Sequence, residues 1–205
     1  MSTPKTWFVT GASQGLGLAL VKRLLREGHQ VAATSRTTEA LAQAVGTPSA
    51  AFLPLQVDLG SDASVQAAIA QTISTFGRLD VVVNNAGYGI GGSIEELTDA
   101  ETRAAFEVNV FGTLNVCRQA LPQLRRQGAG HIINISSIAA LAGATGWAVY
   151  SATKAGLATL SRSLAGMPWP LSLIVTRACA PDRSKETSIW VPAGQCRIAF
   201  SSRLA

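Results

Sequence analysis

The sequence predicts one α/β domain in which a doubly wound parallel sheet carries helices on both faces. Short apolar runs alternate with segments of helical spacing from residue 7 to about residue 165, and this alternation is typical of parallel strands joined by helices. The run Val81-Val82-Val83 is apolar throughout, as a strand buried between two helical layers requires. The chain has 205 residues, 47% hydrophobic and 14% charged, which suits one domain with a full core.

Six short runs are expected to form the strands. They are residues 7–10, 30–35, 51–57, 79–84, 131–135 and 172–176. Pro54 is unfavourable in the third run, because a proline nitrogen has no hydrogen to donate to a strand ladder.

The segments between these strands have helical spacing and recognisable ends. Helices are expected over residues 16–26, 38–45, 61–76, 98–126 and 147–164. Gly28 and the run Gly46-Thr47-Pro48 end the first two, since glycine suits a helix C-terminus. Thr98 and Glu101 predict a capping box at the start of the fourth.

Composition and charge argue against several classes of function. The net charge is +5, but the basic residues form no run, so nucleic-acid binding is not expected. The sequence has no stretch of about 18 uncharged apolar residues, so no membrane span is expected. No signal peptide is expected either. Cys117, Cys179 and Cys196 lack metal-binding spacing, so we expect free thiols in a reducing cytoplasm and no metal site.

Three glycines follow the first strand and open the first helix. Gly11 would allow a tight turn, Gly15 would let the backbone approach a pyrophosphate, and Gly17 would allow close helix packing. The N–H groups at the helix N-terminus would bind the phosphate. A plain strand–helix turn is the alternative, and a P-loop is disfavoured because no Gly-Lys-Ser/Thr follows. The cofactor-binding residues expected in this turn are Gly11, Ser13, Gln14, Gly15, Leu16 and Gly17.

Tyr150 and Lys154 are four residues apart in the last expected helix, so they share one helical face. A nearby ammonium favours the phenolate and makes a phenol usable as an acid or base near neutral pH. Chance supplies such a pair in many helices. Here it follows the glycine turn, the run Asn84-Asn85-Ala86-Gly87 and the strand ending in Ser136-Ser137. Together these motifs resemble the short-chain dehydrogenase/reductase family over about residues 5–165.

The resemblance implies a Rossmann-type fold and hydride transfer between a nicotinamide cofactor and a carbonyl or alcohol. Tyr150 would exchange a proton with the substrate oxygen, Ser137 would hydrogen-bond that oxygen, and Lys154 would lower the tyrosine pKa. Tyr150 and Lys154 would also contact the nicotinamide ribose. Asn109 would distort its helix and hold a water chained to Lys154, with a solvated surface asparagine as the alternative. The implied catalytic residues are Asn109, Ser137, Tyr150 and Lys154.

Further positions concern the choice and placement of the cofactor. An acid at the end of strand two would bind the ribose of NAD, but Ser35 stands there and Arg36 follows. Because arginine can grip a 2′-phosphate with two donors, NADP is expected rather than NAD. Asn85 is equally well explained as a tie between strand ends. The other positions that the resemblance implies are Asp58 and Leu59 at the adenine, and Asn85, Ala86 and Gly87 beside the nicotinamide ribose.

Two mostly apolar segments, residues 88–94 and 139–149, are expected to line the substrate pocket. They favour a small-molecule substrate, an apolar carbonyl or alcohol. Relatives of this kind often assemble through the long helix and the Tyr-Lys helix, so the resemblance implies a homodimer or homotetramer.

Beyond residue 165 the sequence departs from the family pattern. Strand six is followed by Ala180-Pro181-Asp182 where the family has Pro-Gly, and only Thr187 resembles the threonine that contacts the cofactor carboxamide. The chain is therefore expected to consist of a dinucleotide-binding catalytic core, residues 1–165, and an atypical tail, residues 166–205. Two functions compete: an NADP-dependent oxidoreductase, and a shortened relative that binds nucleotide weakly and turns over little.

Overall fold

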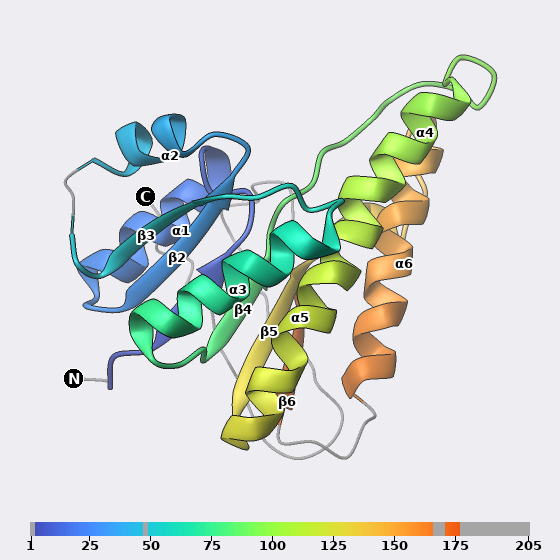
Figure 1. The fold of residues 1–205 in the computed structure, drawn as a ribbon. Coiled ribbons are helices and arrows are strands. Elements are labelled where there is room, and N and C mark those ends of the chain that lie inside the picture. Colours follow the sequence, from blue (N-terminus) through green and yellow to red (C-terminus); the bar gives the residue numbers. More distant parts are fainter. Residues whose placement is uncertain (1–2, 47–48, 166–170, 177–205) are drawn as a thin grey trace, which may run out of the picture.

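The computed structural model describes residues 3–46, 49–165 and 171–176, so the expectations for the rest of residues 166–205 lie outside the described residues. Within these ranges the centre is a six-stranded parallel sheet in the order β3-β2-β1-β4-β5-β6 (Figure 1). The strands are β1 (Thr6–Val9), β2 (Gln30–Ser35), β3 (Phe52–Gln56), β4 (Val81–Asn84), β5 (Gly130–Ile135) and β6 (Leu171–Thr176). The doubly wound α/β fold that the sequence predicts is confirmed.

Helices connect successive strands and cover both faces of the sheet. They are α1 (Gly15–Arg26), α2 (Thr38–Val45), α3 (Asp62–Phe76), α4 (Asp99–Phe106), the π-helical turn η1 (Glu107–Phe111), α5 (Gly112–Gln127), the short 3₁₀ turn η2 (Ile138–Ala140) and α6 (Ala148–Ala165). In Figure 1, α3 and α5 lie over one face of the sheet and α1 and α2 lie over the other.

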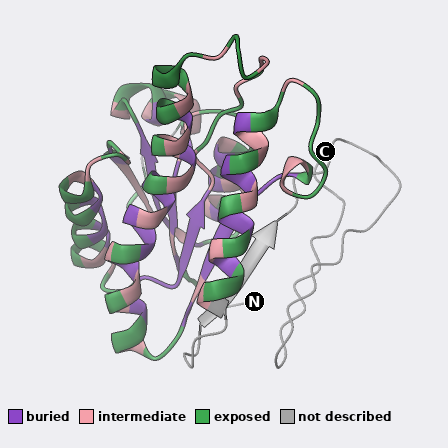
Figure 2. Cartoon of the chain, turned by 90° about the vertical axis from the view of Figure 1, so that its right-hand side faces the viewer, coloured by how far each residue is buried: buried purple, intermediate pink, exposed green. Residues whose placement is uncertain are grey.

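The strand residues alternate between two hydrophobic cores, one on each face. Phe8 packs in the core beneath α3 and α5, and its neighbour Val9 packs in the core beneath α1 and α2. In β4, Val82 belongs to the first core, whereas Val81 and Val83 belong to the second. Since successive strand side chains point to opposite faces, a sheet covered on both sides needs an apolar residue at every position. Figure 2 shows the buried strands enclosed by helices whose outer surfaces are exposed.

The two outermost strands explain two features of the sequence. β3 pairs only with β2 among the described strands, which explains how Pro54 is tolerated, since an edge strand needs ladder hydrogen bonds on one side only. β6 pairs with β5 from Gly130↔Leu171 to Ile135↔Thr176, so the expected sixth strand is present and begins one residue earlier than predicted.

The helix expected over residues 98–126 has the predicted span but not a uniform geometry. α4 begins at a capping box in which Thr98 and Glu101 each hydrogen-bond the other's backbone, as predicted. The chain then passes through the π-helical turn η1 before it continues as α5. Single π turns within α-helices are rare and are often found at functional sites. This one contains Asn109.

Candidate active site

The predicted site residues gather at the carboxyl ends of neighbouring strands. The Gly11 turn follows β1, residues 84–87 end β4, and Ser137 follows β5. The strand order runs outward in opposite directions from the β1–β4 pair, and open α/β sheets bind ligands in the crevice at such a reversal. Lys154 on α6 reaches the same edge, since its Nζ donates a 2.8 Å hydrogen bond to the Ile135 carbonyl at the end of β5.

The three glycines of the first turn serve two different needs. Gly11 has a φ of 64°, and a Cβ there would lie 2.7 Å from the Ala86 Cα. A Cβ on Gly17 would lie 2.5 Å from Asn85 Nδ2, so both positions exclude a side chain by packing. Gly15, which begins α1 with a φ of 58°, has no atom within 4 Å of such a Cβ. It leaves open space beside the first N–H groups of the helix, at the position where the sequence predicts a pyrophosphate.

The remaining residues of this turn face outward. Ser13 is half-buried, Gln14 is exposed, and the apolar Leu16 side chain is 66% exposed. A ligand can therefore reach the space at the start of α1 from the side of these residues.

Thr10 and Asn85 tie the glycine turn to the end of β4. Thr10 Oγ1 accepts hydrogen bonds from the backbone N–H groups of Asn85 and Ala86, each at 3.0 Å. The Asn85 amide donates to the carbonyls of Thr10 at 3.0 Å and Gly11 at 2.9 Å. This network supports a structural role for Asn85, one of the two interpretations that the sequence left open.

The predicted adenosine end of the crevice combines a buried serine with exposed charged side chains. Ser35, the last residue of β2, is buried and its hydroxyl exchanges hydrogen bonds with the backbone of Thr37. Arg36, which follows it, is exposed. Asp58 is also exposed, and its carboxylate accepts a 3.0 Å hydrogen bond from the Gly60 N–H. The Asp58 side chain thus shapes its own loop while remaining accessible.

Leu59 is held against α5. Its carbonyl accepts a 2.9 Å hydrogen bond from Asn115 Nδ2, and a Cβ on Gly112 would lie 2.9 Å from the Leu59 Cβ. Arg118 Nη1 donates to Asn115 Oδ1 at 2.7 Å and so fixes the amide that holds the loop. Asn115 is a contact that the sequence did not indicate.

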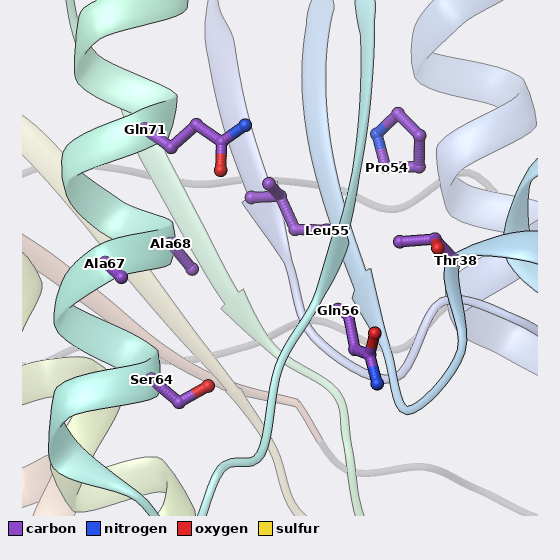
Figure 3. Close-up of a pocket in the computed structure, with 8 residues that line it drawn as sticks. All are labelled: Thr38, Pro54, Leu55, Gln56, Ser64, Ala67, Ala68 and Gln71. Atoms are coloured by element: carbon purple, nitrogen blue, oxygen red, sulfur yellow. The ribbon is translucent and has the colours of Figure 1, made fainter.

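A pocket of about 370 Å³ lies between β3 and α3 (Figure 3). Its lining residues are Thr38, Pro54, Leu55, Gln56, Ser64, Ala67, Ala68 and Gln71. None of the predicted site residues lines it. It adjoins the Asp58 loop, because Ser64 Oγ accepts a 3.1 Å hydrogen bond from the Asp58 N–H.

Tyr150 and Lys154 form a pair on α6, as the sequence predicts. Lys154 Nζ lies 5.8 Å from the centre of the Tyr150 ring. Lys154 is only 4% exposed, and burial lowers its pKa from 10.5 to about 8. The ammonium therefore stays protonated at neutral pH, although burial has weakened its hold on the proton.

Ser136 and Ser137 at the end of β5 have different roles. Ser136 Oγ donates a 3.1 Å hydrogen bond to the Lys154 carbonyl, so it bonds the backbone of α6. Ser137 is 9% exposed, and its hydroxyl accepts a 3.2 Å hydrogen bond from the Ala139 N–H at the start of η2. The Ser137 hydroxyl proton is not needed for that bond and is available to a ligand oxygen.

Asn109 lies at the centre of the π turn and is fully buried. Its Oδ1 accepts a 3.0 Å hydrogen bond from the Tyr88 N–H. Its Nδ2 donates to the Tyr88 carbonyl at 2.9 Å and to Thr153 Oγ1 at 3.1 Å. The predicted helix distortion at this residue is confirmed, and the alternative of a solvated surface asparagine is wrong.

Gly87 lies beside two of the predicted catalytic residues, Asn109 and Lys154. A Cβ on Gly87 would lie 2.9 Å from Asn109 Oδ1 and 3.3 Å from Lys154 Nζ. The two polar atoms therefore border the same small space, which a side chain at residue 87 would enter. Ala86, before it, is half-buried beneath the Gly11 turn.

The two segments expected to line the substrate pocket contact each other. A Cβ on Gly89 would lie 2.8 Å from a ring carbon of Trp147, and the Gly92 N–H donates a 2.8 Å hydrogen bond to the Gly146 carbonyl. The Trp147 ring meets the Tyr150 ring edge-on, with 5.8 Å between centroids, and is 43% exposed. An accessible apolar wall thus stands beside the tyrosine.

Neither a metal centre nor a reactive thiol is evident in the part of the chain that the structure describes. No cluster of three or more His, Cys, Asp or Glu side chains there could hold a metal ion. Cys117 is buried, and burial raises the pKa of its thiol to about 12. Among the described helices, none is long and apolar enough to cross a membrane.

Comparisons with known proteins agree with this arrangement. The 3-ketodihydrosphingosine reductase of Bacteroides thetaiotaomicron is 39% identical over 162 residues, which cover 79% of this chain and 58% of the reductase. A short chain dehydrogenase/reductase from Burkholderia phymatum, solved in complex with NAD, is 26% identical with a TM-score of 0.80, over 85% of this chain and 65% of that one. ElxO, solved with NADP bound, is 28% identical with a TM-score of 0.75, over 80% of this chain and 67% of that one.

The chain spans less than two thirds of the length of relatives such as the reductase. The family model for short chain dehydrogenases nevertheless matches residues 5–185, which include the glycine turn, Ser137, Tyr150 and Lys154. The fold, the arrangement of the site and this match together show that the chain belongs to the short-chain dehydrogenase/reductase family.

Proposed function

We propose that this chain is an oxidoreductase that uses NADP to interconvert a carbonyl compound and a secondary alcohol. The observation that carries the proposal is the Lys154 ammonium, which is buried, held by the Ile135 carbonyl and 5.8 Å from the centre of the Tyr150 ring. A buried cation beside a phenol is a device for proton transfer.

The residues present fit a nicotinamide dinucleotide. The open space at Gly15 would take the pyrophosphate at the start of α1. Asp58 and Leu59 would hold the adenine, and the backbone at residues 86–87 would face the nicotinamide ribose. When bound, the nicotinamide supplies the hydride for reduction or accepts it during oxidation.

The protein's own groups handle the proton and the developing charge. In reduction, the Tyr150 hydroxyl gives its proton to the substrate oxygen as the carbonyl carbon receives the hydride, and the product is an alcohol. Ser137 donates a hydrogen bond to that oxygen and stabilises the charge that develops on it. Lys154 favours the phenolate that remains, and solvent then returns a proton to Tyr150. Oxidation of the alcohol reverses each step.

NADP is the proposed form of the cofactor because no acid stands at the end of β2. The Ser35 hydroxyl is occupied by the Thr37 backbone, and the exposed Arg36 follows it. An exposed guanidinium there can make two charge-assisted hydrogen bonds to a 2′-phosphate. The similar structures hold NAD in one case and NADP in another, so family membership alone does not decide.

We also propose a class of substrate and a state of assembly. Trp147, exposed beside Tyr150, favours a substrate with an apolar group next to its carbonyl. A homodimer or homotetramer through α5 and α6 is proposed from the family resemblance, and light scattering of the purified chain tests it. The catalytic and cofactor-binding residues are proposed to lie within residues 1–165, and β6 adds a further strand to the sheet of this core.

The test combines cofactor binding with turnover. NADPH and NADH are titrated while tryptophan fluorescence is followed, and a panel of apolar ketones and aldehydes is then assayed by loss of NADPH absorbance. We expect tighter binding of NADPH than NADH, with turnover that Tyr150→Phe lowers by about 10²- to 10⁴-fold. Binding without turnover would favour the alternative, a relative that binds nucleotide but catalyses little. Failure to bind either cofactor would overturn both.

A further inference from the structure

Thr153 is a buried threonine that lies between Tyr150 and Lys154 on α6, and its hydroxyl has an unusual pair of partners. It is fully buried. Its Oγ1 donates a 2.7 Å hydrogen bond to the Tyr150 carbonyl one turn earlier and accepts a 3.1 Å hydrogen bond from Asn109 Nδ2. A buried helical threonine commonly makes only the first kind of bond.

Thr72 on α3 shows that simpler case. It is also fully buried, and its hydroxyl donates a 2.8 Å hydrogen bond to the Ala68 carbonyl. The contact with Asn109, 44 residues away in the sequence, is therefore an additional feature of Thr153 that burial and helix geometry do not explain.

The Thr153 hydroxyl and the Tyr88 N–H require the same orientation of the Asn109 amide. The only proton of the Thr153 hydroxyl is used on the Tyr150 carbonyl, so towards Asn109 it can only accept. Asn109 must then present its N–H₂ group to Thr153. The same orientation lets Oδ1 accept from the Tyr88 N–H and Nδ2 donate to the Tyr88 carbonyl.

This chain of bonds crosses the candidate active site. The Tyr88 backbone begins the segment that packs under Trp147, and Asn109 Oδ1 borders the space beside Gly87 that Lys154 Nζ also borders. A change in the amide orientation would therefore alter both the substrate wall and the surroundings of the lysine.

We propose that Thr153 is a positioning residue whose hydroxyl, together with the Tyr88 backbone, fixes the Asn109 amide, and so holds the π turn and the Tyr88 segment in register with Tyr150 and Lys154. The proposal rests on the proposed function for its effect on turnover, but not for its effect on the amide. The Thr153 hydroxyl bonds the Tyr150 carbonyl and the Asn109 amide, so it can affect cofactor affinity only indirectly, and that effect is expected to be smaller than the effect on kcat.

The first experiment observes the amide directly in the 205-residue chain. The side-chain N–H₂ signals of Asn109 are identified in a nitrogen–proton NMR spectrum by their loss in Asn109→Ala. In the parent they should be protected from exchange with solvent. Thr153→Val keeps the side-chain shape without the hydroxyl and should shift these signals and remove their protection, whereas Thr153→Ser should restore both. Thr72→Val, the same change at an equally buried helical threonine, should leave them unaltered.

The second experiment measures kinetics on the same variants. Thr153→Val should lower kcat on the order of tenfold, because a small misplacement of catalytic groups is enough, with the NADPH Kd within about twofold of the parent. Thr153→Ser should recover the rate, and Thr72→Val should not change it. If the valine variant does not fold, Thr153→Ala replaces it in both experiments.

The outcomes separate this proposal from the proposed function. Unaltered Asn109 signals in the valine or alanine variant overturn the proposal whatever the rate. Altered signals with full turnover also overturn it, since the amide orientation would not matter to the reaction. Altered signals in a chain that reduces no carbonyl uphold the orienting role and reject the proposed function alone.

Discussion

The proposed catalytic corner (Asn109, Ser137, Tyr150 and Lys154) and the proposed adenosine end of the crevice (Arg36, Asp58 and Leu59) are built in different ways. At the corner, Asn109, Ser137 and Lys154 are all buried, and each has a hydrogen-bond partner in the protein. At the adenosine end, Arg36 and Asp58 are exposed, and the Asp58 carboxylate accepts a hydrogen bond within its own loop, from the Gly60 N–H.

The difference reflects how closely each group of side chains must hold its position. A group that transfers or orients a proton must hold its position closely, so the core has to surround it. A group that selects between two cofactors needs only to reach the ligand, and an exposed side chain can be exchanged with little effect on folding. Substitutions at the corner should therefore change the rate or the stability, and those at the other end should change affinity alone.

The largest expected effect is that of Tyr150→Phe. The hydroxyl is lost while the ring that meets Trp147 remains, so the fold should be preserved. General acid catalysis contributes about 10²- to 10⁴-fold, and turnover should fall by that factor with NADPH affinity nearly unchanged. Steady-state rates and a fluorescence titration check this. A rate within twofold of the parent would show that Tyr150 is not the proton donor.

The Lys154 ammonium should make stability depend on pH. Burial lowers its pKa to about 8 from 10.5, so between these pH values the unfolded chain binds more protons at this residue than the folded chain does. Its contribution to the free energy of unfolding is thus smallest below pH 8 and rises towards pH 10.5, by on the order of 3 kcal/mol. Lys154→Met should remove this rise.

Urea unfolding of the cofactor-free parent and the methionine variant, at pH 7 and pH 10, measures the effect. The comparison uses the change between the two pH values, because the variant also loses the hydrogen bond to the Ile135 carbonyl. The parent should gain more stability than the variant as the pH rises. A difference between the two proteins that does not vary with pH would contradict a buried ammonium.

At the adenosine end, Arg36→Ala should change cofactor choice and little else. Loss of the charge-assisted contacts to a 2′-phosphate should weaken NADPH binding roughly 10- to 100-fold while NADH binding stays within about twofold. Titrations with both cofactors measure this, with Arg26→Ala on α1 as a control for the loss of one exposed charge. Equal weakening of both cofactors would mean that Arg36 does not contact the phosphate.

The sequence predicted the parts of the molecule that have a periodic or local signal. The alternation of apolar runs and helical segments led to the sheet and its helices, and the glycine spacing led to the turn after β1. The family resemblance implied a distorted helix at Asn109, and the π turn is that distortion.

What the sequence did not reveal depends on contacts between distant residues. Thr153 and Asn115 look like ordinary members of regular helices, and their partners lie 44 and 56 residues away. Likewise, nothing in the run at residues 88–92 indicates that the Trp147 ring occupies the space where a side chain of Gly89 would be. Such contacts follow only from the packing of α5, α6 and their loops.

The smallest expected effect concerns Asn115, which holds the Leu59 carbonyl from α5. Asn115→Ala should loosen the adenine loop by the net worth of one hydrogen bond, about 1 kcal/mol, and so weaken NADPH and NADH to the same extent, roughly fivefold. Gln119→Ala is the matched control, since Gln119 bonds Asp62 from the same helix but does not touch the Leu59 carbonyl. Unlike Arg36→Ala, this change leaves the ratio of the two affinities unaltered, because it acts on the adenine and not on the 2′-phosphate. A shift in that ratio would show that the two loops of the adenosine end are coupled, and that this end is not the set of independent surface contacts described above.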